Sequence, residues 1–419
     1  MSNENHILFL LSSGFPFESS EQHLQAELPY LKKCFEQIYY VTTSSKLNSS
    51  QSETHIPVKN TGNANSLLQK LSHGLHLLSN SDFYKEIFYL IRTKSITSYK
   101  LKSLVHYYFN SLQIVNVVSA HIERNWEQYQ NKKILFYAYW TDEKAIACIL
   151  LKLKFKNSYS ISRAHGWDVY EERHRENYLP WRNFIFSNLD HVFCISKNGF
   201  DYLKARYASF NKASVMRLGT KPLEHFESKK NTELFRILSI SSVIPLKRVE
   251  KIVKVLQLCG NRIPGKIEWI HVGSGADLDK IQNLAHDLLE GKCTYEFKGQ
   301  LTNDALRKLL SNNYFDMFIN VSETEGLPVT IMEAMSAAIP VMATDVGGTS
   351  EIVNAQNGWL VHKNISDNDL AELIFDAINL DKVGMERKRK DALTTFNTQF
   401  NSDLNHAKFV DFLTSNLMK

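Results

Sequence analysis

The 419-residue sequence lacks several features that would restrict its class. It has only 5 cysteines, and they are scattered without the spacing of a metal site or a redox pair. Near the N-terminus the apolar run Ile7–Leu11 is short and no basic segment precedes it, so neither a signal peptide nor a membrane-spanning helix is predicted. We therefore expect a cytoplasmic protein without a metal site, whose cysteines are small buried residues.

Internal repeats and low-complexity tracts are also absent, which excludes solenoids and propellers. The apolar share of 43% and the charged share of 22% are typical of soluble globular proteins and exclude disordered, collagen and coiled-coil classes. A net charge of +5 is too small for this length to indicate a nucleic-acid partner. At roughly 100–200 residues per domain, the length predicts two large domains or three smaller ones.

The positive charge is concentrated in the first half of the chain. Met1–Lys221 carries 27 Lys and Arg against 18 Asp and Glu, a net +9, which leaves 22 − 26 = −4 for the rest. This asymmetry fits attraction to an anionic membrane or acceptor, and equally a chance difference between solvated faces. Phe83–Phe109 interleaves aromatic residues with Lys and Arg, which is typical of a helix on a membrane surface or of a helix pair packed on its own domain.

Short apolar runs of β character alternate with longer helical stretches through most of the chain. The predicted strands are Ile7–Leu11, Ile38–Thr43, Ile134–Tyr139, Tyr159–Arg163, His191–Ile195, Ser214–Arg217, Arg236–Ser241, Lys266–Val272, Tyr295–Gly299, Asp316–Val321, Ile339–Thr344 and Trp359–Val361. Continuous apolar strands separated by helices indicate parallel sheets covered on both faces. The sequence therefore predicts an α/β protein with two Rossmann-like, doubly wound parallel-sheet domains.

A polar stretch separates the two sets of strands. Lys221–Glu233, KPLEHFESKKNTE, has no β pattern and suits an interdomain linker. We place the boundary at residue 228, between an N-terminal domain of residues 1–228 and a C-terminal domain of residues 229–390. Asp391–Lys419 is helical in pattern and is expected to form a separate segment that packs back on the N-terminal domain.

The most informative stretch is Asn320–Ile352, NVSETEGLPVTIMEAMSAAIPVMATDVGGTSEI. It predicts a buried strand, a turn and a helix that starts at Pro328. The first amides of such a helix, at the carboxyl end of a parallel strand, favour an anion such as a diphosphate, and Thr330 adds a hydroxyl donor. The two glycines at 347 and 348 predict a tight turn before a helix capped by Thr349 or Ser350.

Two glutamates in this stretch are candidate ligands for a sugar and a ribose. A carboxylate at Glu325 would be repelled by the anion unless it binds hydroxyl groups, so a sugar is its better partner. Glu333 lies about two turns into the helix and would accept hydrogen bonds from ribose hydroxyls. Each glutamate alone also fits a helix cap or a solvated helical residue.

The whole phrase S-x-x-E-G-L-P…E-A-M…P-V…A-T-D-V-G-G-T-S-E-I resembles the signature of retaining glycosyltransferase family 4, among bacterial surface and exopolysaccharide glycosyltransferases. The resemblance implies the GT-B fold, in which two Rossmann-like domains face a cleft, the first binding an acceptor and the second a nucleotide sugar. It implies a hexosyltransferase-type enzyme of polysaccharide biosynthesis that transfers a sugar with retention to a glycan or lipid-linked glycan. No cofactor is expected besides the donor, for which a UDP-sugar is favoured over a GDP-sugar.

Other segments of the second half resemble the donor site of the family. Lys247 falls on a phosphate-contacting lysine, whereas Ser242 replaces the expected arginine, so half of the phosphate clamp is missing or is supplied by Arg248. Residues 269–280, WIHVGSGADLDK, lack the third glycine of a dinucleotide fingerprint because Leu278 stands there. The donor-binding residues implied by the resemblance are Gly14, Ser242, Lys247, Arg248, Gly273, Gly299, Leu301, Gly326, Leu327, Thr330 and Glu333.

In the first half, residues 162–170, SRAHGWDVY, place His165 just beyond a strand. The family carries such a histidine in contact with the transferred sugar, so the implied catalytic residues are His165, Glu325 and Lys247; a structural histidine is the alternative. Arg163 and Asp168 flank His165, and either orients it or pairs with the other.

Two further segments of this half are candidates for the acceptor side. Tyr137–Asp142 ends a strand with aromatic and acidic groups. In Ser12–Glu21, only Gly14 remains of the glycine pair with which many family members approach the donor diphosphate. The FPF sequence and Glu21 resemble a subgroup in which this loop shapes the acceptor site.

The resemblance also implies a mechanism. Retention would follow from same-face attack, in which the departing phosphate accepts the acceptor's proton, so Glu325 positions the sugar and no protein base is required. One rival is a non-catalytic subunit or scaffold, which Ser242 and the missing glycine pair keep open. A nicotinamide-dependent oxidoreductase is the other, and the absence of G-x-G-x-x-G after any strand disfavours it.

Overall fold

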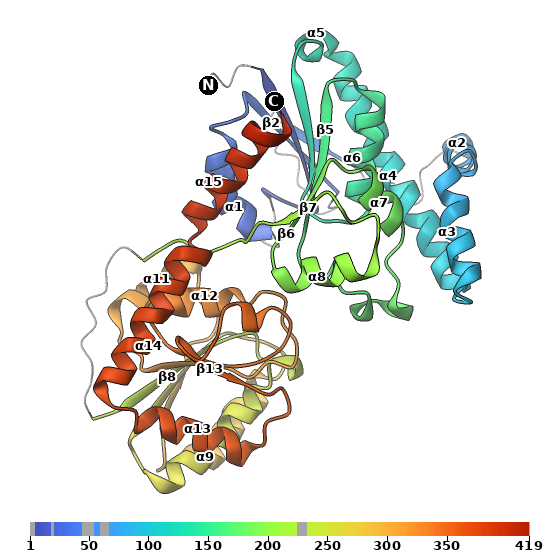
Figure 1. Cartoon of the computed structure of the whole chain (residues 1–419). Coiled ribbons are helices and arrows are strands. Elements are labelled where there is room, and N and C mark those ends of the chain that lie inside the picture. The colour runs from blue at the N-terminus through green and yellow to red at the C-terminus, as the bar shows by residue number, and fades with distance from the viewer. Residues whose placement is uncertain (1–4, 18–20, 44–53, 59–66, 224–232, 419) are drawn as a thin grey trace. The chain divides into compact units, whose positions relative to one another are not determined.

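The computed structural model describes residues 5–17, 21–43, 54–58, 67–223 and 233–418. Internal contacts divide the chain into two compact units: unit 1 is Met1–Met216 with His406–Lys419, and unit 2 is Arg217–Asn405. Figure 1 shows both, each built around one sheet.

The division between the units differs from the predicted boundary at residue 228, which lies outside the described residues. The chain enters unit 2 at residue 217 because the segment after β7 pairs with a distant one. Thr220 N donates to Phe400 O at 3.0 Å, and Ser402 N donates to Thr220 O at 3.0 Å. The predicted C-terminal segment is likewise divided, since residues up to Asn405 belong to unit 2 and only His406–Lys419 belong to unit 1.

Unit 1 contains a seven-stranded parallel sheet in the order β3-β2-β1-β4-β5-β6-β7. Its strands are β1 His6–Ser12, β2 Gln37–Thr42, β3 His55–Pro57, β4 Lys133–Ala138, β5 Ser158–Ala164, β6 His191–Cys194 and β7 Ala213–Val215. Its helices are α1 Gln22–Leu31, α2 Leu67–Leu78, α3 Ser81–Arg92, α4 Ser98–Arg124, α5 Trp126–Tyr129, α6 Glu143–Lys154, α7 Arg182–Asn188, α8 Lys197–Arg206 and the greater part of α15 Ser402–Phe412.

Alternate residues of β1 build the two cores of unit 1, because successive side chains of a strand point to opposite faces. On one face Phe9 packs with Phe136 in a cluster to which α4 and α6 contribute, with ring centroids 5.5 Å apart. On the other face Leu8 and Leu10 pack with residues of α1 and with Phe409 of α15. Figure 1 shows α4 and α6 on one side of this sheet and α1 and α15 on the other.

Unit 2 contains a six-stranded parallel sheet in the order β10-β9-β8-β11-β12-β13. Its strands are β8 Phe235–Ile240, β9 Ile267–Val272, β10 Thr294–Phe297, β11 Met317–Asn320, β12 Val341–Thr344 and β13 Gly358–Val361. Its helices are α9 Val249–Arg262, α10 Leu278–Leu289, α11 Asn303–Asn312, α12 Val329–Ser336, α13 Asp367–Ile378 and α14 Lys382–Thr395. Helices α9, α10 and α13 pack in one buried cluster with Ile237 of β8 and Trp269 of β9, while α12 contacts β11, β12 and α14.

The predicted fold class is confirmed: each unit is a doubly wound parallel α/β sheet. The strand that the sequence did not predict is β3, a three-residue edge strand ending in Pro57, which is too short for a hydrophobic pattern. Among the described helices, including the 27-residue α4, none combines the length and apolar character needed to cross a bilayer.

Candidate functional site

The loops after β8, β9 and β10 lie against one another at the carboxyl edge of the unit 2 sheet. Gly273 has φ +146°, and a Cβ atom there would lie 1.8 Å from the Ser241 carbonyl oxygen. Gly273 N donates to Gly299 O at 2.9 Å. Only glycine permits this backbone and this approach, so the structure brings together Gly273 and Gly299, two of the predicted donor-binding residues. Ser242 is exposed on the first of these loops, and Leu301 is half-buried just after Gly299.

The turn after this loop is fixed by Arg248. Its backbone is left-handed, with φ +50°, and its guanidinium donates to the carbonyls of Val321 at 2.6 Å, Ser322 at 3.1 Å and Lys363 at 3.0 Å. A guanidinium held by three carbonyls acts as a backbone clamp. The guanidinium of Arg248 is therefore bound to backbone carbonyls, and its contact with the donor phosphate stays a prediction.

The clamp by Arg248 positions its neighbour Lys247 beside the loop that follows β11. Lys247 Nζ lies 2.7 Å from Glu325 Oε1, and Asn320 Nδ2 donates to the same oxygen at 3.3 Å. The two charged side chains are 24% and 10% exposed, so they are partly withdrawn from water yet accessible to a ligand. Two of the three predicted catalytic residues therefore form an ion pair, 78 positions apart in sequence.

The turn at Glu325 is held by the glycine pair that follows β12. Gly348 N donates to Gly326 O at 2.7 Å, and a Cβ atom on Gly347, whose φ is +57°, would lie 2.0 Å from the Glu325 carbonyl oxygen. The predicted tight turn is present, but the short helix after it begins at Thr349 itself, whose hydroxyl donates backward to Val346 O. The expected cap by Thr349 or Ser350 is therefore wrong.

Helix α12 starts directly after this turn. Pro328 precedes its first residue, Val329, and no side chain caps its first turn, so its first amides remain directed along the helix axis. Leu327 is buried at the turn, and Thr330 is half-buried in the first turn of the helix. This arrangement, beside the Lys247 ammonium, is suited to an anion.

Glu333 occupies the second turn of α12 and is largely buried. Burial raises its pKa to about 7, and the charge of Arg307 opposes that shift. A carboxyl group that is partly protonated near neutral pH can donate or accept a hydrogen bond. It is therefore suited to a hydroxylated ligand, as predicted for a ribose.

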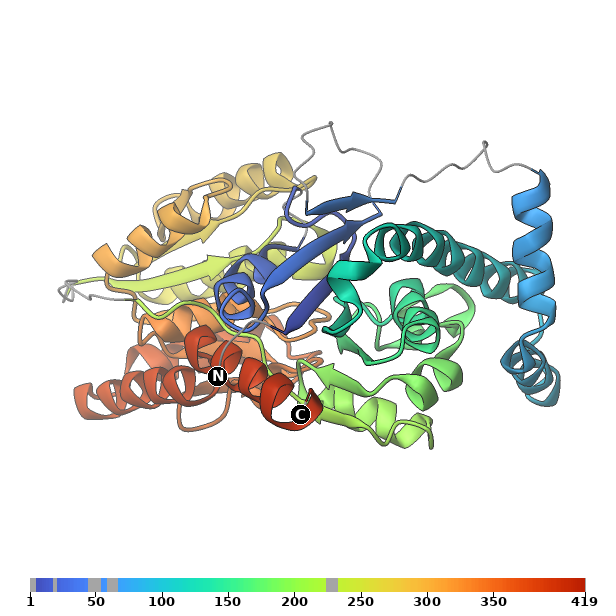
Figure 2. The same ribbon diagram turned by 90° about the horizontal axis from the view of Figure 1, so that it is seen from above.

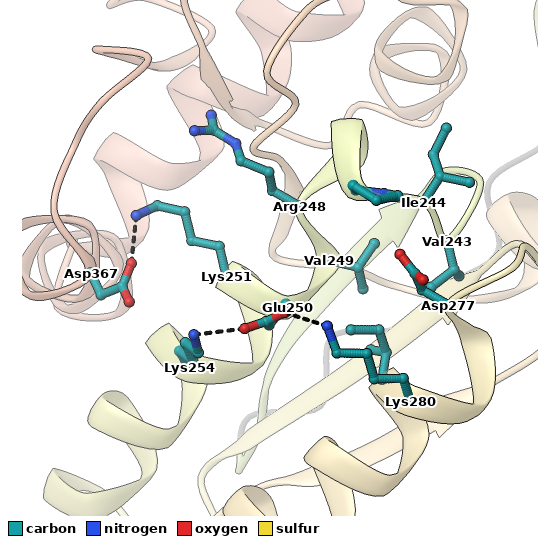
Figure 3. Close-up of a pocket in the computed structure, with 12 residues that line it drawn as sticks. Val243, Ile244, Arg248, Val249, Glu250, Lys251, Lys254, Asp277, Lys280 and Asp367 are labelled. Atoms are coloured by element: carbon teal, nitrogen blue, oxygen red, sulfur yellow. Dashed lines mark hydrogen bonds and ion pairs between the residues drawn. The ribbon is translucent and has the colours of Figure 1, made fainter.

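A separate hollow of about 400 Å³ lies between the starts of α9, α10 and α13 (Figure 3). Its charged side chains pair with one another: Lys254 and Lys280 converge on Glu250, at 2.7 and 3.2 Å, and Lys251 pairs with Asp367 at 2.5 Å. Of the predicted donor-binding residues only Arg248 borders it, with its guanidinium pointing away from Glu250. The hollow is therefore distinct from the Lys247–Glu325 pair.

In unit 1, His165 lies just after β5. Its amide donates to Asp168 Oδ1 at 2.7 Å, and its ring packs on Tyr139 and Trp140, with centroids 4.6 and 4.4 Å apart. The His165 ring nitrogens are buried and have no hydrogen-bond partner among the described residues, because the nearest carboxylate oxygen, on Asp168, is 3.9 Å away. A buried imidazole without a partner is unusual for a structural histidine and is suited to a ligand.

Asp168 fixes the loop that carries His165. Its Oδ2 accepts the Thr141 amide at 2.8 Å while Oδ1 accepts that of His165. Burial disfavours its charge, but the neighbouring His165 ring and these amides together hold the pKa of Asp168 below its ordinary value. Asp168 thus orients the His165 backbone, one of the two predicted roles.

Arg163 does not pair with Asp168, contrary to the alternative interpretation. It is fully buried and donates to Glu27 Oε2 at 2.8 Å and to the Tyr137 hydroxyl at 2.9 Å. Burial raises the pKa of Glu27, whereas the charge of Arg163 lowers it. Since His406 of α15 lies 3.6 Å from the same Glu27 oxygen, this network belongs to the packing of α15 on unit 1.

Glu21 closes the loop that follows β1. Its buried carboxylate accepts the amides of Ser13, Gly14 and Phe15, each at 3.0 Å, and the Trp140 indole Nε1 at 2.7 Å. The amides that a diphosphate would need are therefore bound by an internal carboxylate. Donor binding by Gly14 stays a prediction, and Glu21 is a residue of this loop whose role the sequence did not reveal.

A hollow of about 370 Å³ in unit 1 adjoins this loop. It is lined by Ser13, Glu21, Tyr107, Trp140, Asp142, Glu143, Lys144, Trp167, Asp168, His174, Leu179 and Arg182. Aromatic faces next to carboxylates suit a sugar ring, whose C–H groups pack on the former and whose hydroxyls donate to the latter. Of the predicted segment 137–142, Trp140 and Asp142 line the hollow, whereas Tyr137 is buried in the Arg163 network.

Comparison with known proteins identifies the family of the part that carries the Lys247–Glu325 pair. Residues 220–392 match the family "Glycosyl transferases group 1". This part of the chain belongs to the glycosyl transferases group 1. The match covers the Arg248 clamp, the Glu325 turn and helix α12.

Two curated relatives and one solved structure illustrate the similarity. The poly(ribitol-phosphate) α-N-acetylglucosaminyltransferase of Staphylococcus aureus (strain COL) is 25% identical over 195 residues, covering 45% of this chain and 37% of the relative. The O-antigen biosynthesis glycosyltransferase WbnH of Escherichia coli is 25% identical over 208 residues, covering 49% and 56%. These matches thus span less than two thirds of either relative.

The crystal structure of Anabaena Alr3699/HepE in complex with UDP and glucose matches with a TM-score of 0.64. At 16% identity it covers 98% of this chain and 100% of the other. A similarity at this identity concerns the fold, which is GT-B.

Proposed function

We propose that this protein is a retaining, hexosyltransferase-type glycosyltransferase. It would transfer a sugar from a nucleotide-diphosphate sugar to a glycan or lipid-linked glycan in polysaccharide biosynthesis. The observation that carries the proposal is the Lys247–Glu325 pair at the start of α12, inside the part of the chain that matches group 1.

The donor half of the reaction follows from the chemistry of this pair. Cleavage of the donor places negative charge on the departing diphosphate, and a preorganised cation next to helix amides stabilises that charge. Lys247 and the start of α12 supply both. Glu325 holds Lys247 in place before the donor binds, and then accepts hydrogen bonds from the hydroxyls of the sugar.

We assign binding of the acceptor to unit 1. Its 370 Å³ hollow offers Trp140 and Trp167 for packing and Asp142 for hydroxyl groups. His165, with unpartnered ring nitrogens, would contact the transferred sugar. The proton of the acceptor hydroxyl goes to the departing phosphate, so no side chain is needed as a base and Glu325 is not a nucleophile.

A UDP-sugar is the donor we favour over a GDP-sugar, supported by the bound UDP and glucose in the similar structure. The net +9 of Met1–Lys221 and the O-antigen function named for the WbnH relative support a glycan carried on an anionic lipid. The protein would then work in the cytoplasm, at the inner face of the membrane, without a nucleic-acid partner.

A screen for nucleotide release from several UDP- and GDP-sugars, with and without lipid-linked acceptors, tests this function. We expect release of UDP that depends on the acceptor. A scaffold that pairs with an active partner is the second candidate, favoured by Ser242 and by the occupied amides of the Gly14 loop. The absence of release from every donor, with folded protein, would favour the scaffold.

A further inference from the structure

Helices α2 and α3 form a hairpin whose inner side packs on unit 1. His73 and Leu77 of α2, and Phe83 and Leu90 of α3, are buried on that side. Asn80, between the two helices, donates to the Tyr108 hydroxyl of α4 at 2.9 Å. The inner side therefore accounts for the attachment of the hairpin to its unit.

Each helix also carries an exposed apolar stripe apart from its buried residues. Positions i, i+4 and i+7 share one helix face, and they are exposed and apolar in both helices. They are Leu71, Leu75 and Leu78 on α2, and Tyr84, Phe88 and Ile91 on α3. Leu75 is 70% exposed and Phe88 is 66% exposed. Single exposed apolar residues are ordinary, but two aligned stripes mark an interaction surface.

Figures 1 and 2 show where this surface lies. In both views the hairpin is at the outer edge of unit 1, beyond the end of α4 where α3 joins it, and away from the sheet. None of the stripe residues lines the hollow near Glu21. Within Phe83–Phe109, α3 carries exposed large apolar residues, whereas α4 contributes Leu104 and Tyr108 to the core.

The charges of the hairpin indicate whether its partner is a lipid surface or another protein. Both acidic residues of α3 have internal partners: Asp82 pairs with Lys85 at 2.7 Å, and Glu86 accepts from the Tyr178 hydroxyl at 3.1 Å. Arg92 and Lys94, by contrast, are exposed at the end of α3. Cations beside Leu, Phe and Tyr suit the boundary between anionic headgroups and acyl chains, whereas the core of a protein interface disfavours lysine.

We propose that the exposed face of the α2–α3 hairpin docks unit 1 on an anionic lipid surface. The exposed stripes enter the boundary region of the bilayer, and Arg92 and Lys94 meet the headgroups. The inference extends the proposed function, because a lipid-linked acceptor would lie in that bilayer. It can nevertheless be tested without donor or acceptor, so its failure is distinguishable from failure of the transferase activity.

The test is sedimentation of the full chain with vesicles of phosphatidylcholine and phosphatidylglycerol, compared with phosphatidylcholine alone. We expect binding to the mixed vesicles, and a loss of at least about tenfold in partitioning for Leu75→Ser with Phe88→Ser. The control is Leu153→Ser with Val383→Ser, two apolar positions on other helices that are 69% and 77% exposed. It should bind as the wild type does.

A second pair of variants tests the charge. Arg92→Gln with Lys94→Gln should weaken binding to the mixed vesicles and reduce its sensitivity to salt. Lys156→Gln with Lys204→Gln removes the same charge from exposed positions outside the hairpin and should have little effect.

Two results would overturn the proposal. One is equal or absent binding to both kinds of vesicle by the wild type. The other is a self-associated wild type that the Leu75 and Phe88 substitutions convert to monomer without any change in vesicle binding, which would show that a second copy covers the hairpin.

Discussion

Glu21 accepts a hydrogen bond from the indole Nε1 of Trp140 at 2.7 Å, across 119 positions of sequence. The same carboxylate holds three consecutive loop amides, so one side chain joins the loop after β1 to the aromatic wall of the unit 1 hollow. The Glu21 carboxylate, which accepts from four N–H donors, therefore occupies the place that an anionic ligand would take in this loop.

Replacing Glu21 by Gln should loosen this loop, because an amide NH2 group would face N–H donors. We expect a loss of about 2 kcal/mol in the free energy of unfolding and a several-fold higher KM for the acceptor. Binding of UDP, measured by calorimetry, should stay within twofold. Glu127→Gln, at an exposed position, is the control. An unchanged acceptor KM together with weakened UDP binding would show that the loop serves the donor instead.

Removal of the Lys247 ammonium should reduce catalysis more than stability. Lys247→Ala is expected to lower kcat by about 10²-fold, because the variant lacks the preorganised cation that stabilises the negative charge developing on the diphosphate. Lys254→Ala, which removes an exposed lysine paired with Glu250 on α9, should leave kcat within twofold. The measurement is acceptor-dependent UDP release at saturating donor. Equal loss in both variants would contradict the role of Lys247.

Glu325→Gln tests the sugar-positioning role directly. The variant keeps the shape of the side chain but loses the charge that holds Lys247 and accepts from sugar hydroxyls. We expect turnover of the preferred donor to fall at least tenfold while the protein remains folded. If turnover stays within about twofold of wild type, about 0.5 kcal/mol in activation free energy, Glu325 does not position the sugar.

Arg248→Lys should act through the backbone. A lysine cannot bridge three carbonyls that a planar guanidinium reaches, so we expect a loss of about 2 kcal/mol in the free energy of unfolding, seen as a lower Tm. The backbone role of Arg248 would be contradicted by an unchanged Tm together with a UDP affinity that is tenfold weaker and more dependent on salt. That result would indicate a direct contact between Arg248 and a phosphate.

Glu333 predicts a pH dependence of stability. Its pKa of about 7 lies above the ordinary value of 4.5, so the folded state keeps a proton that the unfolded state has lost between these pH values. Folding is therefore disfavoured progressively as the pH rises from about 4.5 to about 7. Glu333→Gln should raise the Tm at pH values above 7 and leave it nearly unchanged at pH values below 4.5. Glu386→Gln, at an exposed position on α14, should show no such difference.

The sequence by itself determined the fold class, the phrase around Glu325 and every strand except β3. These depend on local patterns: apolar runs such as Ile134–Tyr139 appear as strands within a residue at either end, because burial on both faces of a parallel sheet requires continuous apolar side chains. The turn, the glycine pair and the helix start are equally local, since each depends on backbone preferences of a few neighbouring residues.

Only the tertiary structure decided which charged side chains and backbone amides are available to a ligand. Arg248 and Gly14 are plausible phosphate contacts in sequence, but Arg248 donates to carbonyls 73 to 115 positions away, and the Gly14 amide is bound by Glu21. The unit boundary at residue 217 likewise depends on pairing with residues 400–402. A side chain's partner in a folded chain is set by distance in space, and no local pattern contains that information.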